Sequence, residues 1–406
     1  MTIQGLRTSE NFASNERPLN WRKGIMLRYP NGKAPLLGLT SAMKEESVDD
    51  PEFNWWEKEL SSRRLAISAS LTAPAADTSD TIAVVSGAFA LKRGDMLWAE
   101  KSGEMIWVSA DPVSDTSINV VRGYGGTTPA VVTFGTHNPN LAVIGSSYEE
   151  ASNAPTGVDF DPTQLSNYTQ IFRNTFEMSR TAQKTNLRTK EQVAEAKREV
   201  AELHSVDMER AFWFGSKAIK TVNGKPQRTT RGVLGSIDSG NIVDQAGTAV
   251  KMTDIEGWME RMFRFGSSEK MAFCGNRALL AINQAVRKNS TYNLQFNIKE
   301  YGMNVTRLVC PFGELVLKTH PLFNQMTSDL VGSPVYYSVD SWLWVLDMDY
   351  FTYIYLTDSD TKYQQELQDN GLDGMKSGWI TECGLKVAHA KTHFLLKGLV
   401  SGVVDS

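Results

Sequence analysis

The sequence has little cysteine, and its charges of opposite sign almost cancel. The three cysteines, Cys274, Cys310 and Cys383, lie far apart and form no C-x-x-C pair. This argues against a disulfide framework or a zinc knuckle and is typical of a reducing compartment. The net charge of −4 and the pI of about 5.9 argue against a protein that binds nucleic acid through bulk positive charge.

Long hydrophobic runs are also missing. Residues 1–18 lack the apolar core of a signal peptide. The most hydrophobic run, residues 342–356, contains Asp347 and Asp349 and is too short to span a bilayer. We therefore expect a chain that is made and kept in the cytoplasm.

Residues for catalysis or metal binding form no recognisable motif. In a strand, His389 and His393 would point to the same side with Lys391 between them, which argues against a metal site and predicts partly exposed histidines. Asp347 and Asp349 share a face of another predicted strand, but no nucleophile or histidine lies close in sequence. We predict no catalytic residue, no cofactor, no metal site and no enzyme.

The longest regular pattern is a helix predicted over residues 188–214, which no glycine or proline interrupts. At about 1.5 Å per residue it is roughly 40 Å long. Glu195 and Glu202 are each spaced to pair with Arg198 on its exposed face. Apolar residues recur every three to five positions and predict one narrow stripe against a sheet, formed by Val193, Ala196, Val200, Leu203, Val206 and Ala211.

Residues 1–60 contain scattered prolines and little periodicity, so they cannot bury enough of themselves to form a core. They are nevertheless rich in aromatic residues, among them Trp21, Tyr29, Trp55 and Trp56. We therefore predict an extended arm that packs on its own body or on a neighbour, in preference to a flexible terminus.

A strand-rich segment follows the arm. Residues 61–72 alternate with period two and predict a strand. Residues 81–146 contain short strand-like runs about every 8–12 residues, which is typical of a small antiparallel barrel or sandwich. These runs are Ile82–Val85, Met96–Ala99, Met105–Val108, Ile118–Val121, Val131–Phe134 and Leu141–Ile144. Arg122–Thr127, RGYGGT, is interpreted as a glycine-rich turn, because no Lys-Ser/Thr pair and no helix follow.

The second half mixes helices and strands. Residues 167–185 favour a strand over a helix through their Thr, Ile, Phe and Tyr content. An exposed loop is predicted at 221–231, an amphipathic helix at 254–266, and a further helix, capped by Asn276, at 276–288. Strands are predicted at 271–274, 304–310, 314–319, 334–339, 342–346, 351–356, 379–383 and 385–396. This pattern indicates an α+β domain with a mixed sheet.

The order of these parts resembles the major capsid proteins of tailed bacteriophages with the Hong Kong 97-type fold. Residues 94–130, 167–183 and 207–237 are similar to one subfamily, which carries an inserted small β-domain. The likeness covers roughly residues 60–400, and its weight lies in the order of the stretches. No single motif is diagnostic.

The resemblance implies an α+β Hong Kong 97-type fold with five parts. These are an N-terminal arm (1–60), an extended hairpin arm with connectors (61–76 and 148–185), an inserted small β-domain (77–147), a peripheral domain with the spine helix (186–224 and 380–406) and an axial domain (225–379). Candidate assembly contacts are Trp21, Tyr29, Trp55, Trp56, Phe172, Arg228 and Arg231.

The implied function is structural. Copies of the chain would form the pentamers and hexamers of an icosahedral head enclosing double-stranded DNA, with weak, non-specific contact to the DNA. Portal, scaffold and decoration proteins would be further partners, and no membrane is expected. Two alternatives stay open at this point: the shell of a cellular nanocompartment of the same fold, and a carbohydrate-binding β-protein with 81–146 as its binding module.

Overall fold

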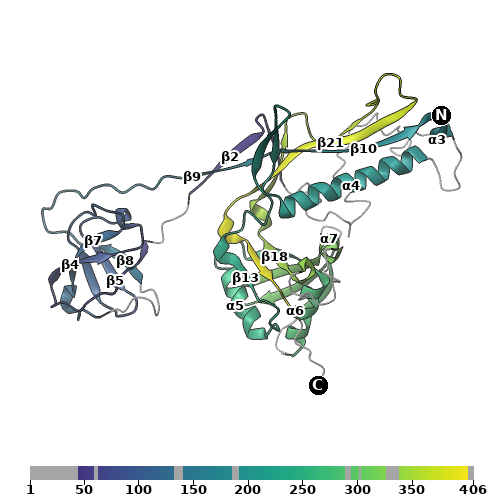
Figure 1. Cartoon of the computed structure of the whole chain (residues 1–406). Helices are drawn as coiled ribbons and strands as arrows, with labels where there is room; N and C mark the ends of the chain where they lie inside the picture. The colour runs from purple at the N-terminus through teal and green to yellow at the C-terminus, as the bar shows by residue number, and fades with distance from the viewer. Residues whose placement is uncertain are drawn as a thin grey trace, which may run out of the picture. The chain divides into compact units, whose positions relative to one another are not determined.

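The computed structural model describes residues 44–58, 63–131, 140–184, 192–288, 294–300, 303–325 and 338–400. The chain divides into two compact units (Figure 1). The first, the body, contains residues 1–55 and 165–406, and the second, the β-domain, contains residues 56–164. Trp21 and Tyr29 lie outside the described residues.

The β-domain is an antiparallel sheet of six strands in the order β3-β8-β5-β6-β7-β4. Its core is the inward set of alternating side chains, such as Leu97 and Ala99 on one strand and Ile106 and Val108 on the next. The strands are β3 (Arg64–Ala66), β4 (Thr78–Ala83), β5 (Asp95–Ala99), β6 (Met105–Val108), β7 (Ser117–Arg122) and β8 (Asn140–Ser146). The prediction of a small antiparallel β-domain is confirmed.

The predicted beginning of the β-domain is wrong. Residues 61–72 were assigned to the hairpin arm, but β3 pairs with β8 in the β-domain sheet. Leu65, Ile67 and Leu71 are buried in its core. Their period-two pattern is that of a core strand, which sequence alone does not distinguish from an arm. The strand predicted at Val131–Phe134 is not formed at Val131, and its remaining residues lie outside the described part.

The spine helix is α4 (Gln192–Phe214), which follows the short helix α3 (Arg180–Lys184). Arg198 pairs with Glu195 and lies 3.9 Å from Glu202, as its spacing predicted. The predicted buried stripe is wrong at its centre, because Leu203 is 58% exposed. The buried face is formed instead by His204, Ser205, Val206, Met208, Glu209, Phe212 and Trp213.

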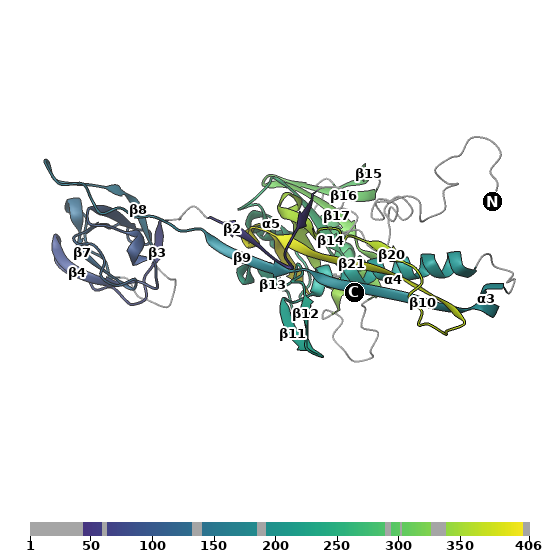
Figure 2. The same ribbon diagram turned by 90° about the horizontal axis from the view of Figure 1, so that it is seen from above.

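A five-stranded sheet lies against the spine helix (Figures 1 and 2). Its order is β1-β19-β21-β10, with β20 also paired to β21. β10 is antiparallel to β21 over ten residue pairs, so the strand predicted over 167–185 is confirmed at 170–179. It is wrong at 180–184, which form α3. The strands are β1 (Glu45–Val48), β10 (Gln170–Ser179), β19 (Phe351–Leu356), β20 (Lys362–Gln364) and β21 (Gly374–Val387).

A mixed seven-stranded sheet forms the rest of the body, in the order β13-β22-β18-β14-β17-β16-β15. Pairs β13/β22 and β14/β17 are parallel, and the others are antiparallel. The strands are β13 (Ile242–Asp244), β14 (Glu269–Cys274), β15 (Leu294–Glu300), β16 (Met303–Cys310), β17 (Gly313–Thr319), β18 (Leu343–Leu346) and β22 (Phe394–Lys397).

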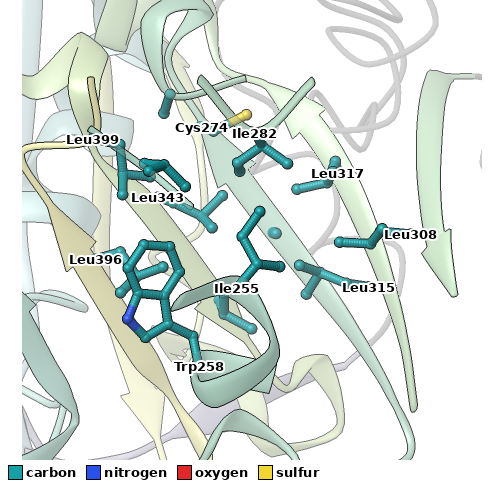
Figure 3. Close-up of a cluster of buried hydrophobic side chains, with 14 of the residues drawn as sticks. Ile255, Trp258, Cys274, Ile282, Leu308, Leu315, Leu317, Leu343, Leu396 and Leu399 are labelled. Carbon is teal, nitrogen blue, oxygen red and sulfur yellow. The ribbon is translucent and has the colours of Figure 1, made fainter. Parts of the chain in front are cut away.

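Both faces of this sheet are covered. Helices α5 (Met252–Met262) and α6 (Asn276–Lys288) pack on one face, where Ile255 and Trp258 meet leucines of the sheet (Figure 3). The other face, with Phe273 and Trp344, joins the core beneath the end of the spine helix. The helices predicted at 254–266 and 276–288 are confirmed.

Two predicted boundaries of the body are corrected by these sheets. Residues 351–379 were assigned to the axial domain, but β19, β20 and the start of β21 pair in the sheet beside the spine helix. Conversely, β22 belongs to the seven-stranded sheet, although 380–406 were assigned to the peripheral domain. The strand predicted over 385–396 is interrupted by a 3-10 turn at Ala390–Thr392, which lets the chain pass from one sheet to the other.

Two short ribbons complete the described elements. β2 (Glu52–Glu57) pairs with β9 (Thr163–Tyr168). β11 (Ala218–Val222) and β12 (Lys225–Thr229) form an antiparallel ribbon that projects from the body (Figure 2). A further short helix, α7, spans Pro321–Gln325. No helix in the described ranges has the length and apolar character that a membrane crossing needs.

Candidate assembly surfaces

The spine helix is fixed to the sheet below it by a chain of polar contacts. His204 Nδ1 donates to Asn174 Oδ1 (2.7 Å), and the Asn174 amide donates to Asp207 Oδ2 (2.8 Å). His204 Nε2 lies 2.8 Å from the Thr381 hydroxyl of β21. Burial lowers the pKa of His204 to about 4, although Asp207 opposes the shift, so the ring is neutral near pH 7.

A second buried polar cluster holds the C-terminal end of the helix. Glu209 Oε1 accepts from Trp213 Nε1 (2.8 Å) and from His320 Nε2 (2.9 Å), and all three side chains are fully buried. The backbone N–H of Leu322 donates to His320 Nδ1 (3.2 Å), which fixes the tautomer. The indole of Trp213 also packs edge-on against Phe323. The helix end is thereby joined to β17 and α7, so the two sheets are held through it.

Neither of these two clusters is predicted by the sequence pattern. A polar residue on a helix normally marks the exposed face, so the predicted apolar stripe does not include His204 and Glu209. The sequence did contain one signal, because His204, Met208 and Phe212 are spaced at i, i+4 and share one face of the helix. This face is recognised as buried if a histidine is accepted as a buried residue with a hydrogen-bond partner.

Part of the predicted N-terminal arm packs on its own body. β1 pairs in parallel with β19, and Phe53 and Trp55 are buried against Ile354. Trp56, in contrast, is 62% exposed. Segment 45–57 carries six carboxylates and no basic residue, namely Glu45, Glu46, Asp49, Asp50, Glu52 and Glu57.

The predicted exposed loop at 221–231 is part of the β11–β12 ribbon. The turn is Asn223-Gly224, with both residues at positive φ, which is the geometry that this dipeptide favours in tight hairpins. All five residues of β11 are exposed. Ile219 and Val222 are 55% and 41% exposed, respectively. Such exposed apolar side chains on a projecting ribbon are typical of an interaction surface.

The proposed contact residues have different positions. Trp55 and Phe172 are buried inside their own subunit, so neither lies free on its surface. Trp56 is exposed. Arg228 and Arg231 are half-buried, with Arg228 on β12 and Arg231 after its end. The Arg231 backbone N–H donates to Asn167 Oδ1 (2.7 Å), which anchors the base of the ribbon.

In the β-domain, the glycine-rich segment is a turn, as predicted. Arg122 is fully buried and donates to both oxygens of Glu104 (2.7 and 2.8 Å). Glu104 also accepts from the backbone N–H of Gly123 (3.0 Å) and of Ala130 (3.2 Å). The turn is therefore organised around an internal carboxylate, and three of its glycines have positive φ: Gly123, Gly125 and Gly126.

The residues examined for acid–base or metal chemistry have structural contacts. Asp347 is buried and accepts from the backbone N–H of Ser267 (2.8 Å), whereas Asp349 is exposed, so they form no carboxylate pair. His393 is fully buried, which contradicts its predicted partial exposure, and burial lowers its pKa to about 4. His389 lies outside any strand, at positive φ. Within the described residues, no group of His, Cys, Asp and Glu could hold a metal ion.

Comparison with known proteins gives the class of the protein. A family model described as SU10 major capsid protein matches residues 8–400. The "Major capsid protein" of Pseudomonas phage PaMx41 is 27% identical over 328 residues, which cover 77% of this chain and 76% of the relative.

Solved structures with some likeness include shell proteins of two kinds. The holo-SrpI encapsulin complex from Synechococcus elongatus PCC 7942 has a TM-score of 0.42 at 10% identity, over 61% of this chain and 79% of that one. Mycobacterium phage Patience has a TM-score of 0.42 at 10% identity, over 64% and 79%. The capsid of Myoviridae phage XM1 has 0.41 at 11% identity, over 63% and 81%.

The family match spans almost the whole chain and defines the class as a structural protein of a phage shell. The chain belongs to the SU10 major capsid protein family. The predicted phage major capsid protein is thereby confirmed, and the inserted β-domain, long helix and α+β body follow the order that the Hong Kong 97-type resemblance implied. As a capsid protein, it is a component of the virion, where copies assemble into an oligomeric shell.

Proposed function

We propose that this chain forms the pentamers and hexamers of an icosahedral phage head that encloses double-stranded DNA. The observation that carries the proposal is the family match over residues 8–400. The projecting β11–β12 ribbon and the exposed Trp56 support it, because both leave apolar surface uncovered on one copy. The net charge of −4 suits a wall that does not hold the packaged polyanion tightly.

The further partners follow from the same proposal. Portal and scaffold proteins would act during assembly in the host cytoplasm, and decoration proteins would bind the finished shell. Residues 1–60 would serve as an arm toward neighbouring subunits, anchored to their own body through β1 and Trp55.

The test is electron microscopy and light scattering of the chain produced in a bacterial host, alone and with the other head proteins of its phage. Rings or uniform hollow shells tens of nanometres wide are expected, and native particles should contain DNA that is protected from nuclease. A chain that stays monomeric at high concentration under both conditions would overturn the proposal. Native particles without DNA would contradict the proposed enclosure of double-stranded DNA.

A further inference from the structure

The body carries two surface segments of opposite charge. The basic ribbon, residues 217–231, contains five basic residues and no acidic one: Lys217, Lys220, Lys225, Arg228 and Arg231. The acidic segment, residues 45–57, lies in the body except for its last two residues and contains six carboxylates and no basic residue. In a chain whose net charge is only −4, such separation of charge is typical of complementary interaction surfaces.

The basic ribbon has little support from its own subunit. An isolated two-stranded hairpin is at best marginally stable in water, yet every residue of β11 is exposed, and so are the first three of β12. Lys220 and Lys225 lie on one face of the ribbon together with Val222, because Lys220 pairs with Gln227 and Val222 pairs with Lys225 across the strands. This face offers both charge and apolar surface to a partner.

The acidic segment is accessible on the same body. β1 is the edge strand of the five-stranded sheet, and Glu45 and Glu46 are exposed on it. Asp49 and Asp50 are exposed directly after the strand. Within one subunit the two surfaces meet at the base of the ribbon, where Lys217 Nζ lies 3.2 Å from Glu52 Oε1.

We propose that the basic ribbon of one copy docks on the acidic segment of a second copy. The two surfaces occupy different places on one body, so the contact is head-to-tail, and such contacts close into rings when the rotation permits. The inference rests on the proposed function, since rings are what a shell of pentamers and hexamers needs. Double-stranded DNA is the less favoured occupant, because a phosphate backbone would leave Val222, on the same face as the two lysines, without an apolar partner.

The test uses charge reversal in the full-length chain. Variant one carries Lys220→Glu and Lys225→Glu, and variant two carries Glu45→Lys and Glu46→Lys. Each variant alone should reduce the yield of rings and shells at least about tenfold, because like charges then face each other. The matched control for variant one, Lys101→Glu with Lys184→Glu, makes the same change in net charge as variant one at two other exposed lysines and should assemble normally.

Mixing separates a contact between copies from a folding defect. A ribbon made acidic should dock on a segment made basic, and the two unchanged surfaces remain compatible, so a one-to-one mixture of the variants should recover rings with an even number of subunits. Native mass spectrometry gives the ring sizes, and circular dichroism checks that each variant is folded.

Two results would overturn this proposal while leaving the proposed function intact. The first is normal assembly of variant one with weaker binding to double-stranded DNA, which would assign the ribbon to nucleic acid. The second is a folded variant pair whose mixture recovers no rings. If the unaltered chain forms neither rings nor shells, the proposed function itself fails.

Discussion

The β-domain and the interface below the spine helix bury polar side chains in different ways. In the β-domain, the Arg122–Glu104 pair joins residues only 18 positions apart and closes a local turn. Below the spine helix, His204 bonds to Thr381, 177 positions away, and Glu209 bonds to His320, 111 positions away. One region uses buried polarity to shape a loop, and the other uses it to hold distant segments in place.

The difference has a physical basis in how each core is filled. The β-domain core is closed by alternating apolar side chains of its own strands, so polar groups are needed only at its margin. The spine helix meets strands from two sheets, and apolar packing alone tolerates several positions of a helix on such a surface. The hydrogen bonds of His204 and Glu209 have directional geometry and therefore select one of these helix positions.

The largest expected effect comes from breaking the ion pair of the β-domain. Glu104→Ala leaves the fully buried Arg122 without its main counter-charge and removes the acceptor of two backbone N–H groups. Removing one partner of a buried pair costs about 3–5 kcal/mol. Urea unfolding followed by tryptophan fluorescence should therefore show a destabilised β-domain transition.

A double variant sharpens this test. Glu104→Leu with Arg122→Met replaces both charges by apolar groups and should recover much of the lost stability, since no unpaired charge is left. Equal destabilisation by the single and the double variant would show that packing, and not the unpaired charge, determines the effect.

The second prediction compares two faces of the spine helix. Met208 is 1% exposed and lies against Cys383, so Met208→Ala should lower the free energy of unfolding by about 3 kcal/mol through lost burial and a cavity. The matched control is Leu203→Ala, at a residue that is 58% exposed. This control should change the free energy by less than about 0.5 kcal/mol.

The buried Met208 and the exposed Leu203 also show how much of the structure a sequence pattern can predict. The regular spacing of short apolar runs identified most strands of the β-domain, because most inward residues of these strands are apolar, with Asp95 and Arg122 as buried exceptions at strand ends. The helix itself was predicted, but its buried face was not, because the pattern favoured Leu203 over His204. Whether a histidine is buried depends on Asn174 and Thr381, which lie far away in sequence.

The strand pairings show the same limit. The sequences of residues 61–72 and 170–179 do not determine which strand each segment pairs with, since backbone hydrogen bonds do not depend on the identity of the side chains. The choice between an arm and a core strand for Leu65 was decided by the surface available to bury it. The assembly surfaces were harder still to predict. Trp55 and Trp56 are neighbours on β2, yet Trp55 is buried and Trp56 is exposed, and which of the two is buried depends on how β2, paired with β9, lies on the body.

The third prediction concerns acid. The folded-state pKa of His204, about 4, lies below its ordinary value of 6.5. The unfolded state therefore binds more protons between these pH values, so the contribution of His204 is fully present above about pH 6.5 and is lost as the pH falls toward 4. The total loss is at most about 3 kcal/mol.

The measurement is the free energy of unfolding of the unaltered chain and of His204→Gln between pH 7 and 4. The variant should show a shallower decline, because one proton uptake is removed. His393→Gln is the comparison, since burial lowers the pKa of His393 to the same value. Parallel curves for the unaltered chain and His204→Gln would contradict a neutral, buried His204.

The smallest effect is expected on the exposed side of the spine helix. Arg198 pairs with Glu195 and Glu202, but its side chain is 41% exposed, so water screens both attractions. Arg198→Ala should change the free energy of unfolding by less than about 0.5 kcal/mol, since alanine also has the higher helix propensity. A loss above about 2 kcal/mol in the isolated subunit would show that the charged face also holds the helix in place, and the contrast between its two faces would then fail.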